Sequence, residues 1–354
     1  MAPRVEPTVD TIVIGAGQAG LAAAYYLQQH GVSFVVLDDR PAVGEVWAAR
    51  FDALTLFSPA WVSGLPGYGW SGNALRYPSK DEAAQYLRDY AAHFRFPVHL
   101  QQRVMRVAAL PAGGYAVDTA AGRYYRSRAV IICTGAYNAP RQPAFAAELA
   151  SSVVQLHSRD YRRASQLPGH GPVAVVGSGN SALQIAADLA ATGRPVYAAY
   201  DEQTPALPNN TAMWSFLTVT GLLRASRHSS LGQRLLHRPE PVVSSDLARL
   251  HRFANVHFIG RARQVAGQTS LQGTELTTPP LEAVVWATGY GPAYSWLAVP
   301  VLDAAGEPRH HRGLSPAPGL AFLGLPWLNS RSSALMGGVG RDARFVVESL
   351  LKTT

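Results

Sequence analysis

Cysteine, lysine and long apolar runs are what this sequence of 354 residues has least of. Its single cysteine, Cys133, can form no internal disulfide and no Cys-x-x-Cys pair, which excludes reductase chemistry through a protein dithiol. No uninterrupted apolar run approaches the ~18 residues of a membrane span, so we expect none. The first ten residues, MAPRVEPTVD, lack the apolar core of a secretion signal, and we therefore expect a cytoplasmic protein.

Lysine occurs only at positions 80 and 352, so 29 of the 31 basic residues are arginine, and the formal net charge is +8. The arginines are scattered, without a basic run interleaved with aromatic residues, and we expect no nucleic-acid partner. His310 and His311 are adjacent in a polar stretch typical of solvated loops. The other histidines lack zincin spacing, so we expect no metal site.

Two Gly-rich stretches repeat one pattern, DTIVIGAGQAGL at residues 10–21 and PVAVVGSGNSAL at residues 172–183. Each has a β-branched run, then Gly-x-Gly-x-x-Gly or Ala, then an Ala-rich helical pattern, which is typical of a dinucleotide-binding strand–turn–helix. A further apolar run ends at an acidic residue in both units, Asp38 and Asp201. One copy would be weak support, because glycine turns also serve packing. Two matching copies favour two nucleotide sites.

In the first copy we expect Gly15 to permit the tight turn and Gly17 to let backbone N–H groups approach a pyrophosphate. Gly20 lets the helix pack closely on the strand. The second copy repeats these positions as Gly177, Gly179 and Ala182.

Two stretches do not follow the alternation of strand and helix. Residues 41–77 are rich in aromatic residues, Gly and Pro, which predicts a structured loop packed on a planar cofactor ring or around its own small aromatic core. Residues 203–245 hold two inserted helical patterns, at 213–223 and 231–238. These are too short to cross a bilayer, and we interpret the insertion as an active-site lid rather than a surface-lying segment.

Short apolar strands are predicted at residues 129–133 and 283–286. Each runs into a Thr-Gly pair at its C-terminal end, where open α/β sheets bind ligands. The pairs are Thr134–Gly135 and Thr288–Gly289.

The order of elements predicts an α/β fold of two dinucleotide-binding, Rossmann-like domains, the second inserted into the first. We place the first domain at residues 1–158 and 283–354 and the second at 159–282, with 148–171 as the connection. Helices are expected at 79–94, with Ser79 as N-cap, and at 333–351.

The sequence resembles class B flavin-dependent monooxygenases, most closely their short bacterial members, over essentially its whole length. The motifs that carry the resemblance are GAGQAG, the Gly-x-x-Trp of 44–47, LTLFSPAWVSGLPG, CTGAYNAP, GSGNSA, WATGY and GLPWLNSRSSALMGGVGRD. The resemblance implies FAD at the first turn and NAD(P)H at the second. It also implies that O2 oxygenates a small lipophilic substrate, a sulfide, amine or ketone, through a C4a-(hydro)peroxyflavin.

The resemblance also implies site residues. Those for FAD are Gly15, Gly17, Gln18, Ala19, Gly20, Asp38, Trp47, Thr134, Gly135 and Gly324. Those for the nicotinamide nucleotide are Gly177, Gly179, Asn180, Ser181, Ala182, Asp201, Thr288 and Gly289. We place Phe57 and Asn180 in the catalytic site.

The sequence departs from the family in two places. The linker fingerprint Phe-x-Gly-x-x-x-His-x-x-x-Tyr/Phe keeps His157 and Tyr161 but has Ser151 and Val153 for the Phe and Gly. His157 is either a functional hinge residue or a satisfied structural histidine. Phe57 stands where many relatives have an asparagine beside the flavin, and loss of that amide predicts a monooxygenase that releases part of its oxygen as peroxide.

Three functions stay open: a monooxygenase, an NAD(P)H oxidase or dehydrogenase that passes electrons to a quinone, metal ion or protein, and a redox-sensing flavoprotein. No flavin-linkage motif is present, so we expect non-covalent FAD. The carboxylates of Asp201 and Glu202 would repel a 2′-phosphate, so we expect NADH to be used at least as well as NADPH. The substrate and the oligomeric state are left open, a homodimer being one alternative.

Overall fold

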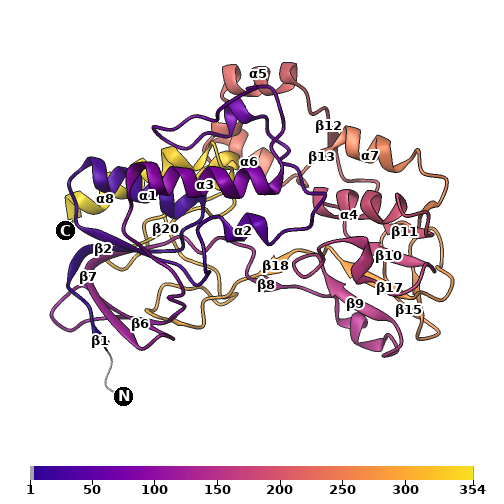
Figure 1. The fold of residues 1–354 in the computed structure, drawn as a ribbon, viewed down its shortest axis with the longest axis horizontal. Helices are drawn as coiled ribbons and strands as arrows, with labels where there is room; N and C mark the ends of the chain where they lie inside the picture. Colours follow the sequence, from indigo (N-terminus) through magenta and orange to yellow (C-terminus); the bar gives the residue numbers. More distant parts are fainter. Residues whose placement is uncertain (1–3, 354) are drawn as a thin grey trace.

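The computed structural model describes residues 4–353, which form two sheets lying side by side with helices packed over them (Figure 1). The first sheet has nine strands in the order β19-β5-β6-β7-β2-β3-β4, with β1 and β20 also paired to β7. Its strands are β1 (Arg4–Val5), β2 (Val9–Ile14), β3 (Phe34–Leu37), β4 (Val98–His99), β5 (Val104–Ala109), β6 (Tyr115–Thr119), β7 (Arg123–Ile132), β19 (Leu297–Ala298) and β20 (Leu320–Phe322). Strands from both ends of the chain therefore build this sheet.

The second sheet is parallel throughout, in the order β14-β11-β10-β17-β9. Its strands are β9 (Val154–His157), β10 (Val173–Val176), β11 (Val196–Ala199), β14 (Val256–Phe258) and β17 (Ala283–Trp286). All residues of β10 and β17 are buried, as expected for central parallel strands covered on both faces. The predicted α/β fold with one dinucleotide-binding unit inserted into the other is confirmed.

The predicted domain boundaries cut this second sheet. They assign β9 and β17 to the first domain, whereas both strands pair with each other and β17 also pairs with β10. The stretch 148–171, interpreted as a connection, thus contains a strand. The pairing partner of β9 is more than a hundred residues away, so no local pattern marks it. We propose that the second domain extends from β9 through β17.

Eight α-helices are described within residues 4–353. They are α1 (Gln18–Gln29), α2 (Glu45–Ala48), α3 (Lys80–Phe94), α4 (Asn180–Ala190), α5 (Thr211–Thr220), α6 (Ser230–Leu236), α7 (Ser244–Leu250) and α8 (Val339–Thr353). Short 3₁₀ turns are η1 (Ala60–Val62), η2 (Ala144–Glu148), η3 (Ala164–Gln166), η4 (Leu222–Arg224) and η5 (Arg331–Ala334). None of these helices is long and apolar enough to cross a membrane.

The structure agrees with one of the two helices predicted outside the Gly-rich turns, at 79–94, and shortens the other, at 333–351. Helix α3 begins as predicted: Ser79 accepts the N–H of Glu82, and the Glu82 carboxylate accepts the N–H of Ser79 in a capping box. The C-terminal helix begins later than predicted, at Val339 rather than near Ser333. Side chains at Gly337 and Gly338 would overlap the carbonyl oxygens of Val62 and Ser332, and the chain there forms a 3₁₀ helix and a hydrogen-bonded turn before α8 begins.

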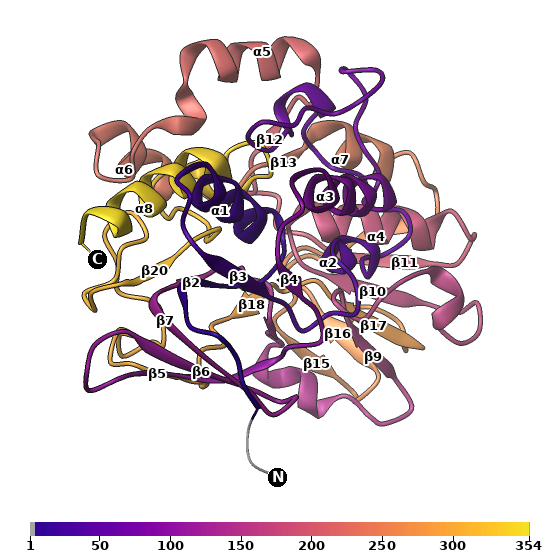
Figure 2. The ribbon, with the colours of Figure 1, turned by 60° about the vertical axis from the view of Figure 1, so that its left-hand side comes forward.

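Three short strand pairs complete the fold: β8 (Ala139–Pro140) with β18 (Tyr290–Gly291), β12 (Ala206–Leu207) with β13 (Val242–Val243), and β15 (Gln264–Ala266) with β16 (Ser270–Gln272). The first pair joins the segments that leave the two sheets. The second closes the base of the insertion, whose helix α5 stands at the top of the molecule in both ribbon views (Figures 1 and 2).

Candidate cofactor and active site

The turn between β2 and α1 has two glycines that the protein itself requires. Gly15 has a φ of +106°, and a Cβ there would lie 2.6 Å from the carbonyl oxygen of Cys133. A Cβ on Gly20 would overlap the carbonyl oxygen of Gly15. A Cβ on Gly17, in contrast, would have no described atom within 4 Å. Packing therefore explains Gly15 and Gly20, whereas the space beside Gly17 is open to a ligand.

Helix α1 begins at this turn without a side-chain cap among the described residues. Helices α3, α5 and α6 are different, because Ser79, Asn210 and Ser229 accept N–H groups of their first turns. The first N–H groups of α1 are thus left for an anion, and the helix dipole favours one.

Asp38 follows β3 and holds the turn through its carboxylate. Its Oδ2 accepts the N–H of Ala16 at 2.6 Å, and its Oδ1 accepts the N–H of Arg40 at 2.8 Å. Burial raises the pKa of the Asp38 carboxyl, although both N–H groups act in the opposite direction. The acid that follows β3 therefore lies at the turn and contacts it through the N–H of Ala16.

The second turn repeats this geometry. Gly177 has a φ of +147°, and a Cβ there would overlap the carbonyl oxygen of Ala287. A Cβ on Gly179 would meet no described atom within 4 Å, and α4 also begins without a side-chain cap among residues 4–353. The third position is Ala182, whose methyl group is buried. Two uncapped helices thus follow two open glycines, which fits a phosphate-bearing ligand at each.

Each turn packs against the strand end that carries a Thr-Gly pair. Cys133 precedes Thr134–Gly135, and Ala287 precedes Thr288–Gly289, so the clashes that require Gly15 and Gly177 come from equivalent backbone. The N–H of Arg141 donates to Gly289 at 3.0 Å, and β8 pairs with β18 just beyond the two pairs. The ends of the two units therefore meet at one seam, which we call the inter-sheet seam (residues 134–141 and 288–291).

Two further predicted FAD residues adjoin the first turn. Gly324 has a φ of +78°, and a Cβ there would lie 2.5 Å from the Cβ of Ala19. Glycine is needed because the end of β20 approaches the first turn of α1 closely. Gln18 donates to the carbonyl oxygen of Ala334 at 3.5 Å, which links α1 to the segment before α8.

Trp47 supplies a polar atom without a partner. Its indole Nε1 is buried and has no hydrogen-bond partner among the described residues, and the same is true of the Tyr77 hydroxyl. Burying a donor without a partner is costly, so a ligand that accepts from Trp47 would remove the cost. Together with the open glycines, this orphaned donor fits a flavin beside the 41–77 loop.

His157 is a satisfied structural histidine. It is buried, its Nδ1 accepts the N–H of Arg159 at 3.1 Å, and its Nε2 lies 3.0 Å from the carbonyl oxygen of Gly289. This arrangement puts the proton on Nε2, and burial lowers the pKa of the ring, which keeps it neutral. His157 thereby fixes β9 to the Thr288–Gly289 segment.

Sequence reasoning missed a cluster at the inter-sheet seam. Arg50 Nη1 lies 3.3 Å from the Tyr290 hydroxyl, and its guanidinium is 5.6 Å from the ring centroid of Tyr137. The Tyr290 ring packs edge-on against His157 at 4.9 Å. The sequence signal that could have revealed this cluster is an aromatic residue shortly after each Thr-Gly pair. Arg50 comes from the 41–77 loop, which nothing local connects to the seam.

The two residues predicted to be catalytic contact the insertion. Phe57 is 39% exposed and stacks on Trp214 of α5, with ring centroids 6.5 Å apart. Asn180 Oδ1 accepts the N–H of Val243 at 2.8 Å, which ties the base of the insertion to α4. Ser181 is exposed beside it. The catalytic roles of Phe57 and Asn180 stay predictions.

The insertion is also fixed to the first sheet's C-terminal segment. Arg227 donates from its backbone to Asn329 at 2.6 Å and from its guanidinium to Trp327 at 3.0 Å. Glu240 pairs with Arg331 at 2.6 Å and accepts from the Trp327 indole. The insertion therefore bridges the two sheets through several polar contacts.

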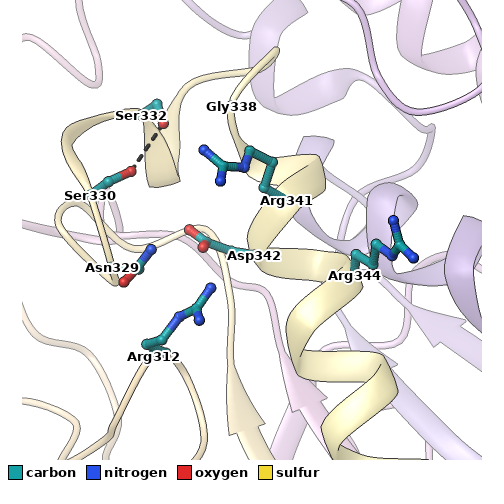
Figure 3. Close-up of a pocket in the computed structure, with 8 residues that line it drawn as sticks. All are labelled: Arg312, Asn329, Ser330, Ser332, Gly338, Arg341, Asp342 and Arg344. Atoms are coloured by element: carbon teal, nitrogen blue, oxygen red, sulfur yellow. Dashed lines mark hydrogen bonds between the residues drawn. The ribbon is translucent and has the colours of Figure 1, made fainter. Parts of the chain in front are cut away.

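A separate cavity of about 200 Å³ lies at the start of α8 (Figure 3). Arg312, Arg341 and the buried Asp342 line it, with the Asp342 carboxylate between the two guanidinium groups. Burial raises the pKa of Asp342, while a hydrogen bond with Ser333 and the two arginines lower it. None of the predicted cofactor residues lines this cavity, and its three arginines, Arg344 included, outnumber its one carboxylate.

Comparison with known proteins agrees with this geometry. Residues 12–311 match the family described as "Pyridine nucleotide-disulphide oxidoreductase". An uncharacterized CzcO-like oxidoreductase of Geobacillus kaustophilus is 38% identical over 97% of this chain and 98% of its own. The solved flavin-containing monooxygenase of Stenotrophomonas maltophilia has a TM-score of 0.81 and 28% identity, covering 98% of this chain and 99% of that one.

A shorter match is to the indole-3-pyruvate monooxygenase YUCCA1 of Oryza sativa, which is 30% identical over 51% of this chain and 45% of its own length. The single cysteine excludes the dithiol chemistry that the family description mentions, and the two open turns match a flavin and a nicotinamide nucleotide. The chain therefore belongs to the pyridine nucleotide-disulphide oxidoreductase family and, within it, to the class B flavin monooxygenase-like enzymes.

Proposed function

We propose that the first turn binds FAD non-covalently and the second binds NADH, and that the enzyme oxygenates a small soft nucleophile, a sulfide or an amine. The observation that carries the proposal is the inter-sheet seam, where the ends of both nucleotide units meet. Hydride transfer needs the two cofactors in contact, and each turn packs against a strand end that leads into this seam.

The chain's own groups have distinct tasks in this proposal. A bound flavin supplies hydride acceptance and oxygen activation. The uncapped N-terminus of α1 binds the pyrophosphate, Asp38 accepts from the ribose hydroxyls, and Trp47 donates from Nε1. His157 holds the Thr288–Gly289 segment in place. The insertion, packed through Phe57 and Trp214, excludes water from the seam.

The remaining predicted residues are assigned by position. Gly135, Gly324, Ala19 and Gln18 adjoin FAD in this proposal; Asn180, Ser181, Ala182 and Gly289 adjoin the nicotinamide nucleotide. We assign Phe57 to anchoring the insertion rather than to oxygen activation, because its stacking partner is Trp214.

The preference for NADH has support from the arginines near the second unit. Arg194 is almost fully buried and is committed to Glu282 at 3.2 Å and to the carbonyl oxygen of Gly171. Arg163 pairs with Asp52 at 3.0 Å. Arg194 is therefore held away from a 2′-phosphate, and the carboxylates of Asp201 and Glu202 follow the end of β11, where that phosphate would bind.

Product analysis of the purified protein with NADH, O2 and a model thioether tests the function. We expect heat to release FAD, and sulfoxide to form in proportion to NADH consumed. Stoichiometric peroxide without sulfoxide would instead assign an NADH oxidase, and negligible NADH turnover a redox sensor. A kcat/KM for NADPH more than about tenfold above that for NADH would contradict the cofactor assignment.

A substitution at position 57 separates the two roles of Phe57. If Phe57 only anchors the insertion, Phe57→Asn lowers the unfolding temperature and leaves the ratio of sulfoxide to NADH unchanged. A rise in that ratio would restore the catalytic role that the sequence predicts.

A further inference from the structure

The inserted segment of residues 203–239 is basic in its second part, because all of its arginines and histidines lie between residues 224 and 238 and α5 itself carries no charge. It contains four arginines and two histidines but no aspartate or glutamate. Arg224, Arg234 and Arg238 are exposed, and none of them forms a salt bridge within residues 4–353. The segment therefore presents positive charge to solvent without counterions of its own.

Helix α5 of this segment is apolar on two opposite sides. Trp214 is 8% exposed and packs on Phe57. Phe216 and Val219 are 56% and 87% exposed, and at 100° per residue both project from the side opposite Trp214. Single exposed apolar residues are ordinary, but a helix whose outer face is apolar is typical of a surface that another phase or molecule covers.

The neighbouring loop extends this apolar face. The loop that carries η1 lies beside α5 in both ribbon views (Figures 1 and 2), and the contact of Phe57 with Trp214 joins them. Trp61 is 38% exposed and Leu75 is 53% exposed, and the backbone N–H of Trp61 donates to Ala74 at 3.0 Å. We call Phe57, Trp61, Leu75, Phe216 and Val219 the apical surface.

The charge of the segment decides between two occupants of the apical surface. A two-fold dimer through this surface would place each copy's basic segment against the same segment of the other, and like charges would repel. An anionic lipid surface has the opposite charge, and its headgroup region also accommodates exposed Trp and Phe side chains.

We infer that the apical surface docks on an anionic lipid membrane, with α5 lying in the plane of the interface and the insertion's arginines on lipid phosphates. Helix α5 has ten residues, too few to cross a bilayer. Helix α5 supplies the apolar outer face, and the arginines that follow it at 224–238 supply the positive charge that interfacial helices usually carry themselves. This binding goes beyond the proposed oxygenation and does not depend on it.

Co-sedimentation of the full-length protein with lipid vesicles tests the inference. The probes are vesicles of phosphatidylcholine alone and of phosphatidylcholine with phosphatidylglycerol, each at low and high salt. The variants are Phe216→Ser with Val219→Ser, and Arg234→Gln with Arg238→Gln. Matched controls lie on β5 and the residue before it, at the far end of the molecule from α5 (Figure 2): Met105→Ser, which is 53% exposed in the wild type, and Arg103→Gln with Arg106→Gln.

We expect binding to vesicles that contain phosphatidylglycerol, release by high salt, and weak binding to phosphatidylcholine alone. Loss of two arginines should weaken binding about 25-fold, at about fivefold per arginine, and the apolar pair at least about tenfold. The β5 controls should bind as the wild type does, and circular dichroism should show that all variants are folded. Failure of the wild type to pellet at low salt, or equal loss in the β5 controls, would overturn the inference. So would a dimer that Phe216→Ser with Val219→Ser abolishes in the absence of vesicle binding.

Discussion

The two Gly-rich turns have the same backbone form but are held in place differently. In the first, the side chain of the acid holds the turn, because Asp38 accepts the N–H of Ala16 at 2.6 Å. In the second, the side chain of the turn holds the acid, because the Asp201 N–H donates to Ser178 Oγ at 2.8 Å. The third position also differs: Gly20 has no room for a methyl group, whereas Ala182 carries one.

The shared and the different positions have different physical origins. Gly17 and Gly179 both face open space, so the protein's own packing does not require glycine at either. A phosphate that must approach the backbone would require it at both. Gly20 and Ala182 face the protein, and the size of each residue matches the distance between its own helix and strand. Of the two glycines that the turns share, packing requires the first, Gly15 or Gly177, whereas the second, Gly17 or Gly179, is the one that we assign to the ligand.

The largest expected effect comes from the third position. Gly20→Ala places a methyl group on the carbonyl oxygen of Gly15, which is backbone and cannot turn away. We expect the free energy of unfolding to fall by ~1–3 kcal/mol or more, which is the cost typical of overpacking. This cost exceeds the ~1 kcal/mol by which alanine in place of glycine stabilises a helix. Urea unfolding measures it. The matched change Ala182→Gly should cost only about 1 kcal/mol. Equal losses would mean that the two helices are equally close to their strands.

The second position separates ligand binding from folding. Gly17 and Gly179 have φ values of −76° and −96°, which alanine adopts without strain, and neither methyl group would meet the protein. We expect Gly17→Ala to weaken FAD binding at least about tenfold, or ~1.4 kcal/mol, with an unchanged circular dichroism spectrum. Gly179→Ala should retain FAD and raise the KM for NADH by a similar factor.

Flavin titration and steady-state kinetics on the two variants check this assignment. Loss of FAD from Gly179→Ala, with Gly17→Ala unaffected, would reverse the order of the two cofactors along the chain. Normal binding of both nucleotides by both variants would show that neither open glycine faces a phosphate.

Both turns could be predicted from the sequence because each is a local pattern: a β-branched run, spaced glycines and a helix within about twenty residues. The capping box at Ser79 and the Thr-Gly strand ends are local in the same sense. The strand β9, the stacking of Phe57 on Trp214 and the contact of Arg50 with Tyr290 are not. Each joins segments more than a hundred residues apart, and no spacing in the sequence records such a pairing.

The serine of the second turn gives a smaller effect. Ser178→Ala removes the acceptor for the Asp201 N–H and should cost about 0.5–1.5 kcal/mol, the usual net value of one hydrogen bond. Because Ser178 lies in the second unit only, the KM for NADH should rise while the FAD content stays at the wild-type level. Denaturant unfolding and flavin absorbance report the two quantities. A loss of FAD would show that the two turns are coupled through the inter-sheet seam.

The smallest effect concerns the ionisation of Asp38. Burial raises the pKa of this carboxyl above its ordinary value of 3.8, so the folded protein retains the proton to a higher pH than the unfolded chain does. Stability falls with rising pH wherever the folded state binds more protons, so the contribution of Asp38 declines as pH rises through the window just above 3.8. Asp38→Asn cannot ionise, and its stability relative to wild type should therefore improve across that window, on top of a constant cost for the altered contact with Ala16. Urea unfolding of both proteins at a series of pH values between about 4 and 6 measures the difference.

Ser178→Ala is the matched control, because it removes a contact between turn and strand without removing an ionisable group, and its difference from wild type should not change with pH. A wild-type protein that gains stability over Asp38→Asn as the pH rises would show that the N–H groups of Ala16 and Arg40, rather than burial, govern this carboxylate.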